Sequence, residues 1–156
     1  MGRSRPALAT ALGTAVLAAG ALAFAPTASA VDPTTATVSA DCGSAGAGEA
    51  TLTATQDGTA ATITLSSSAV KAPIDVGAGS VSTTLTLSKN GTDTATFTGD
   101  SNPAMAAGDD VNSGPLDGTV AAGDVLEAQS VELVIFGVIT VSCTATSPQS
   151  PGPFTF

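Results

Sequence analysis

Apolar and polar residues alternate along most of the chain after residue 35, and this two-residue period constrains the fold more than any other feature. From Ala36 to Cys42 the even positions are apolar and the odd positions are polar. The same alternation recurs in residues 51–55, 61–65, 81–87 and 131–143. Successive side chains of a strand point to opposite faces, so each run predicts a strand with one buried face. The chain is therefore expected to be all-β.

Turn residues between these runs predict hairpins. Asp57-Gly58 and Asn90-Gly91 each separate two alternating segments, and Asn-Gly supplies the two positive-φ positions of a type I′ turn. The segment VELVIFGVITVSC, residues 131–143, is the most apolar part of the chain after the first thirty residues. Its apolar run is too short for a membrane helix, which needs about 18 apolar residues. We expect two core strands, roughly 125–135 and 138–145, that meet near Phe136-Gly137.

The first thirty residues have the pattern of a secretory signal peptide. Arg3 and Arg5 precede a long apolar stretch, and the small-residue motif ASA at 28–30 is a typical cleavage site. We therefore expect residues 1–30 to be removed and the protein to be secreted, with no membrane span in the mature chain.

Two cysteines follow the predicted export signal, near the beginning and the end of the remaining chain. Cys42 and Cys143 both fall on the apolar side of their alternating segments. An oxidising compartment permits a disulfide between them. A metal site lacks further ligands, because the chain has no His and no third Cys. The sequence predicts one structural disulfide.

About seven to nine short strands with frequent turns are typical of an immunoglobulin-like Greek-key β-sandwich. We assign residues 31–146 to this domain and residues 147–156 to a Pro-rich extended tail. The layout of Cys42, the segment GTVAAGDVLE and the closing VITVSC resembles small exported actinobacterial β-sandwich proteins of uncharacterised function. The resemblance covers roughly residues 36–145 and implies the fold, but no active site. The enediyne-carrying chromoproteins are similar in size, export and fold class, but they typically use two disulfides.

Charge and composition restrict the function. All thirteen acidic residues follow the predicted signal peptide, against two lysines, so the surface repels nucleic acid. Without His, a Ser-His-Asp triad cannot form, and no Gly-rich phosphate loop is present. A carboxylate pair of the glycosidase type remains open, although the chain has no Trp or Tyr to stack on sugars. We predict that the protein is not an enzyme.

The least regular segment, residues 99–118, is the candidate binding loop. Its Asp and Asn oxygens suit calcium, although their spacing does not match an EF-hand, and the same residues also make solvated turns. The candidate ligands or partner contacts are Asp100, Asn102, Asp109, Asp110, Asn112 and Asp117.

These observations favour a secreted, non-enzymatic structural or interaction module, extracellular or associated with the cell envelope. Its partner is expected to be a protein or a cell-wall component, and no cofactor other than calcium is indicated. One alternative is a small-ligand carrier with a cleft between sheets, walled by Phe97, Phe136 and Val138. The other is a hydrolase that uses paired carboxylates.

Overall fold

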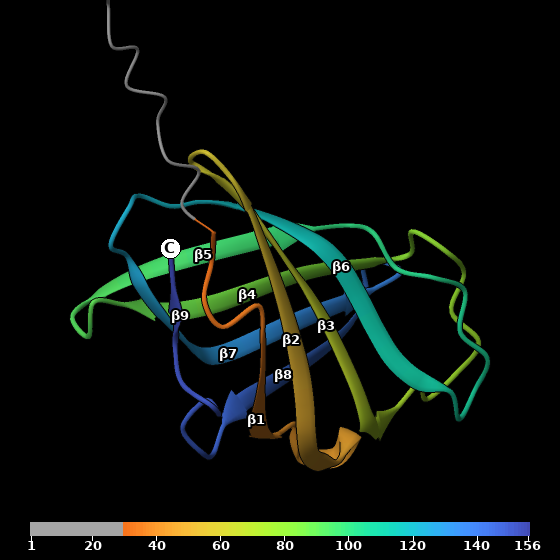
Figure 1. Ribbon diagram of the computed structural model, residues 1–156. Helices are drawn as coiled ribbons and strands as arrows, with labels where there is room; N and C mark the ends of the chain where they lie inside the picture. The colour runs from red at the N-terminus through yellow and green to blue at the C-terminus, as the bar shows by residue number, and fades with distance from the viewer. Residues whose placement is uncertain (1–29) are drawn as a thin grey trace, which may run out of the picture.

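A computed structural model describes residues 30–156, so residues 1–29 of the predicted signal peptide lie outside the described part of the chain (Figure 1). The described residues form strands and one short 3-10 helix, with no α-helix among them. The elements are β1 (Thr35–Asp41), η1 (Gly43–Ala45), β2 (Ala47–Asp57), β3 (Ala60–Lys71), β4 (Val81–Lys89), β5 (Asp93–Gly99), β6 (Asp110–Thr119), β7 (Val125–Ile135), β8 (Ile139–Ala145) and β9 (Phe154–Thr155). The all-β prediction is confirmed.

The sheet closes into an eight-stranded antiparallel barrel, so the predicted immunoglobulin-like sandwich is wrong. The strand order is β4-β5-β6-β3-β2-β1-β8-β7, and β7 pairs again with β4 to complete the ring. Nine residues of β4, Val81–Lys89, take part in this closing ladder with β7. Each of these eight strands therefore has a neighbour on both sides, whereas an open sandwich leaves edge strands. The alternation of apolar and polar residues specifies which face of a strand is buried. This alternation is the same in a sandwich and in a barrel, so it does not distinguish the two architectures.

Two of the ladders around the barrel are very short. β1 meets β8 through only Ala40↔Ala145 and Asp41↔Thr144, and β5 meets β6 only through Thr98↔Asp117. Figure 1 shows β1, β2, β3 and β6 crossing in front of β4, β5, β7 and β8. The barrel thus consists of two four-stranded halves joined at two narrow seams.

Close packing at the β5–β6 seam requires a glycine. A Cβ atom added to Gly118 would lie 2.5 Å from the ring of Phe97, which is fully buried. The β6 backbone therefore rests directly against the aromatic ring. Gly118 allows β6 to approach β5 closely enough to turn the sheet at this corner.

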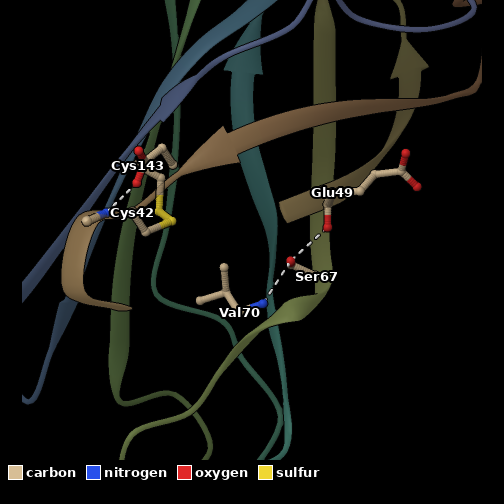
Figure 2. The surroundings of a disulfide bond; sticks show 7 residues. Cys42, Glu49, Ser67, Val70 and Cys143 are labelled. Atoms are coloured by element: carbon tan, nitrogen blue, oxygen red, sulfur yellow. Dashed lines mark hydrogen bonds between the residues drawn. A yellow bond between two sulfur atoms is a disulfide. The ribbon is translucent and has the colours of Figure 1, made fainter. Parts of the chain in front are cut away.

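The predicted disulfide between Cys42 and Cys143 is confirmed, and it lies at the β1–β8 seam (Figure 2). The last ladder pair of that seam is Asp41↔Thr144, so the two cysteines occupy the next register position. Both cysteines are buried. The covalent bond therefore continues the seam at the point where backbone pairing stops.

The C-terminal tail forms part of the barrel wall and closes one end of it. Thr37 and Ser150 exchange two backbone hydrogen bonds of 2.8 Å, which cover the outer edge of β1. Beyond them, β9 pairs with the beginning of β7. The rings of Phe154 and Phe156 are buried and meet edge to face, with centroids 6.4 Å apart. The tail is extended, as its prolines suggested, but its aromatic residues belong to the core.

An ion pair lies at the same end of the barrel, between the buried carboxylate of Asp124 and the partly exposed Lys89. The Lys89 ammonium is 2.8 Å from Asp124 Oδ2, which also accepts a hydrogen bond from the Ala121 N–H. The Lys89 hydrogen bond is the main cause that lowers the pKa of Asp124, and burial of the carboxyl opposes it. A lowered pKa in the folded state means that the ionised carboxylate stabilises the fold.

Because of this ion pair, we expect the folded protein to lose stability in acid. The contribution of Asp124 is present above the unfolded pKa of about 4 and is lost as the pH falls through the lower folded pKa. We expect the urea midpoint of the wild type to fall between pH 6 and pH 3, and Asp124→Asn to reduce this dependence. Asp110→Asn is the control, because its partner Lys71 and Asp110 itself are both half exposed and such pairs contribute little. An unchanged pH profile in Asp124→Asn would contradict the prediction.

Candidate functional site

The irregular segments gather at one end of the barrel, which we call the loop end. It consists of η1, the loops 72–80 and 100–109, and the β7–β8 turn 136–138. The opposite end has the short turns after β2 and β4 and the buried tail. Loops held on a rigid scaffold commonly carry recognition, so the loop end is the candidate site.

The structure separates the six predicted loop residues. Asp109, Asp110 and Asn112 line one shallow hollow of about 430 Å³, together with Pro103 and other loop residues. Asp117 lies further along β6, where it pairs with Thr62 and Thr98 on the outer wall. Asp100 lies in the loop that follows β5. Half of the predicted set therefore shares one hollow.

Asn102 holds the loops together and is buried. Its Oδ1 accepts hydrogen bonds from the Ser80 and Val81 N–H groups, at 2.9 and 3.0 Å. Its Nδ2 donates to the carbonyls of Gly77 and Pro103, at 2.9 and 2.7 Å. This amide makes four hydrogen bonds within the protein, so its role here is structural. The sequence suggested that Asn102 is a calcium ligand because the Asn side chain serves both in turns and in calcium binding.

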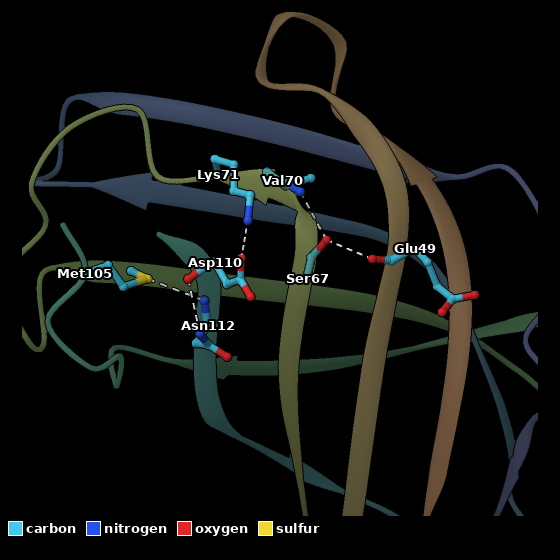
Figure 3. A network of polar contacts seen from close by, with 7 residues as sticks. All are labelled: Glu49, Ser67, Val70, Lys71, Met105, Asp110 and Asn112. Carbon is cyan, nitrogen blue, oxygen red and sulfur yellow. Dashed lines mark hydrogen bonds and ion pairs between the residues drawn. The ribbon is translucent and has the colours of Figure 1, made fainter. Parts of the chain in front are cut away.

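The hollow beside these loops is only partly negative. Lys71 forms an ion pair with Asp110 (Figure 3). Asp109 Oδ2 accepts a 2.8 Å hydrogen bond from the Ala106 N–H. The Asn112 N–H lies 3.4 Å from Met105 Sδ, and its side-chain amide donates to the Asp110 carbonyl. Between residues 30 and 156, no three His, Cys, Asp or Glu side chains converge as metal ligands. Calcium binding by this loop stays a prediction.

The two long loops form one lobe. Val76 and Met105 exchange backbone hydrogen bonds of 2.7 and 2.9 Å, and both side chains are buried. Asp75 Oδ1 accepts a 2.8 Å hydrogen bond from the Ala107 N–H. The lobe therefore presents a fixed surface rather than two independent loops.

The barrel interior is filled by side chains. Three pockets lined mainly by core residues are small, at about 30 Å³ each. Phe97 lies within the core, whereas Phe136 and Val138 lie on the surface at the β7–β8 turn. The structure does not bring together the three residues that were expected to wall a ligand cleft.

Exposed apolar side chains mark the β7–β8 turn, a feature that the sequence pattern did not reveal. Phe136 is 51% exposed, Val138 79% and Ile139 39%. We call residues 136–139 the apolar tip. The only other large apolar side chain with comparable exposure in the described chain is Ile74, at 40%, in the loop 72–80. All four side chains therefore belong to the loop end. The sequence feature that could have revealed the apolar tip is the turn at Gly137, which has apolar residues on both sides.

A second hollow, of about 310 Å³, lies on the outer wall across β4, β7 and β8. It is lined mainly by hydroxyl side chains, including Thr84, Thr86 and Ser142, and by the carboxylate of Glu132. Thr98, Thr84, Glu132 and Ser142 occupy one continuous cross-strand row. This wall is polar and uniform, and it lacks the apolar groups that mark the loop end.

None of the described helices has the length and apolar character that a membrane crossing requires. Comparisons with known protein families, with curated proteins and with solved structures gave no match.

Proposed function

We propose that this protein is an exported, non-enzymatic β-barrel that works as an interaction module in the extracellular medium or at the cell envelope. It contacts its partner through the loop end. The observation that carries this proposal is the concentration of the most exposed large apolar side chains at that end. Apolar groups gathered on one surface region favour contact with another macromolecule.

Several features support a binding role over catalysis. The chain has no His, and both of its cysteines are joined in the disulfide. Asp124, a buried carboxylate at the opposite end, is neutralised by Lys89. The filled interior favours recognition at the surface over transport of a ligand inside the barrel.

The disulfide supports export, because such bonds persist in oxidising compartments and are rare in the cytosol. It also stiffens the barrel at one of its two narrow seams, which suits a scaffold that presents fixed loops. A secreted location agrees with the predicted signal peptide.

Co-sedimentation of the purified protein with isolated cell walls of its producer tests the proposal. The assay is run with calcium and again with EDTA, and it includes Val138→Ser at the apolar tip. Thr92→Ser, in the turn at the opposite end, is the matched control. Pelleting that Val138→Ser reduces and Thr92→Ser does not would support binding through the loop end, and release by EDTA would implicate residues 99–118.

Two results would contradict the proposal. One is substrate turnover that a single carboxylate substitution abolishes, which would identify an enzyme. The other is a protein that stays in the supernatant with the walls and also binds no secreted protein of the producer.

A further inference from the structure

We infer that the apolar tip anchors the protein to a partner that presents an apolar pocket ringed by Lys and Arg side chains. This inference rests on the proposed function, because it names the binding surface and the chemistry of the partner.

Two hairpins of the barrel use the same turn with different residues. Asn90 and Gly91 have φ values of 53° and 76°, and Phe136 and Gly137 have φ values of 51° and 70°. In both turns the N–H at the fourth position bonds to the carbonyl at the first, at 3.2 Å for Thr92 and 3.1 Å for Val138. Both are therefore type I′ turns, for which Asn-Gly is the preferred pair.

Phe is a poor residue for the first central position of such a turn. Positive φ is unfavourable for a bulky side chain, whereas Asn tolerates it. Asn90 also accepts a 2.9 Å hydrogen bond from the Val125 N–H, which ties its turn to β7. The Phe136 ring is half exposed. A residue that is strained and exposed, where the same fold accepts Asn, indicates a role outside the fold.

The tip is held in place by its backbone. The Phe136 N–H donates a 2.9 Å hydrogen bond to the Ser80 carbonyl, and the adjacent pair Val81↔Ile135 belongs to the long β4–β7 ladder. The side chains of Phe136, Val138 and Ile139 are therefore presented from a fixed base. A preorganised aromatic anchor loses little conformational entropy on binding.

Charge identifies the class of partner. Thirteen acidic residues and two lysines lie within the described chain, and both lysines are in ion pairs. At the loop end, Asp75, Asp100 and Asp109 form no ion pair with another described residue. An apolar tip on a chain with this excess of acidic residues is complementary to an apolar pocket with a basic rim. A second copy of this acidic chain and an anionic lipid surface both carry the wrong charge.

The experiment replaces the first central residue of each turn. Phe136→Asn gives the tip the residue that the sister turn uses, and Asn90→Ala is the matched control at the opposite end. The probe is a synthetic amphipathic peptide of Lys and Leu with one Trp. The chain contains no Trp or Tyr, so the emission reports the peptide alone. Thermal unfolding of each variant is measured in parallel.

We expect Phe136→Asn to raise the unfolding midpoint and to weaken peptide binding at least tenfold, because it removes the anchor while improving the turn. Asn90→Ala should lower the midpoint and leave the affinity unchanged. Raising the salt concentration should weaken wild-type binding, since the excess acidic charge of the chain acts through screened interactions.

Other outcomes would overturn the inference. Binding of Phe136→Asn within twofold of the wild type excludes the tip as anchor, and a lowered midpoint makes Phe136 a structural residue. Tip-dependent binding to phosphatidylcholine vesicles, or tip-dependent dimers in sedimentation, would identify a different occupant. If both the wild type and Phe136→Asn pellet with cell walls, this inference fails and the proposed function stands. If the wild type binds neither walls, secreted protein nor peptide, both fail.

Discussion

Replacing Cys42 and Cys143 together by alanine is expected to lower the free energy of unfolding by about 4–5 kcal/mol. The disulfide spans 101 residues, so it removes a large loop-closure entropy from the unfolded chain. It also lies beside a seam with only two ladder pairs, so the folded state has little else to hold β1 to β8. Urea unfolding followed by circular dichroism measures the difference.

Wild-type protein kept in a reducing agent should unfold at the same urea concentration as the double variant. This control separates the loss of the covalent link from the loss of two buried sulfur atoms. A decrease of less than about 1 kcal/mol would show that the tail, which covers β1 at Thr37 and Ser39, is sufficient to hold the seam.

Phe154→Ala is expected to cost about 3–5 kcal/mol, the usual range for a buried Phe. Its side chain is fully buried, and its ring packs against Phe156 at the end of the barrel opposite the loops. Removing the ring leaves a cavity where β9 meets β7, so the tail loses its main contact with the core. The thermal midpoint and the urea midpoint should both fall.

Phe136→Ala is the matched control, because it deletes the same ring from an exposed position. We expect its free energy of unfolding to stay within about 0.5 kcal/mol of the wild type. If Phe154→Ala is tolerated equally well, the tail does not contribute to the core. Comparing Phe154→Ala with Phe136→Ala therefore tests whether residues 147–156, which the sequence analysis assigned to a Pro-rich tail, contribute to the core.

Local features of the fold followed from the sequence. Alternation located the strands, because burying one face of a sheet imposes a period of two. Asn90-Gly91 predicted a type I′ turn, and the observed φ values confirm it. The expected strands 125–135 and 138–145 correspond to β7 and β8 within one residue. The disulfide was predictable because both cysteines face inward.

Features that depend on distant partners did not follow from the sequence. Val81 pairs with Ile135 and closes the barrel, but no local pattern specifies which strand lies beside β4. A sandwich and a barrel bury the same alternate residues, so the sequence favoured the commoner architecture. The role of Phe154 was hidden because prolines and polar residues surround it.

The candidate site was predictable only in part. Residues 99–118 were predicted to be the least regular segment, but only residues 100–109 form a loop, because residues 110–118 belong to strand β6. Within the predicted set, Asn102 is buried and holds the loops together, and Asp117 lies on the outer wall. Asp and Asn serve turns, caps and cation binding with the same oxygens, so composition does not separate these roles. The apolar tip was missed because its residues look like core residues in the sequence.

The order of the strands around the barrel has a consequence for biosynthesis. β1 is among the first strands to be synthesised, but on one side its partners are β8 and the tail, which are made last. No N-terminal portion can complete its sheet while the chain is still emerging, because the closing contacts are the most distant in sequence. The barrel can therefore close only after β8 and the tail have been synthesised, and the disulfide between Cys42 and Cys143 can form only then.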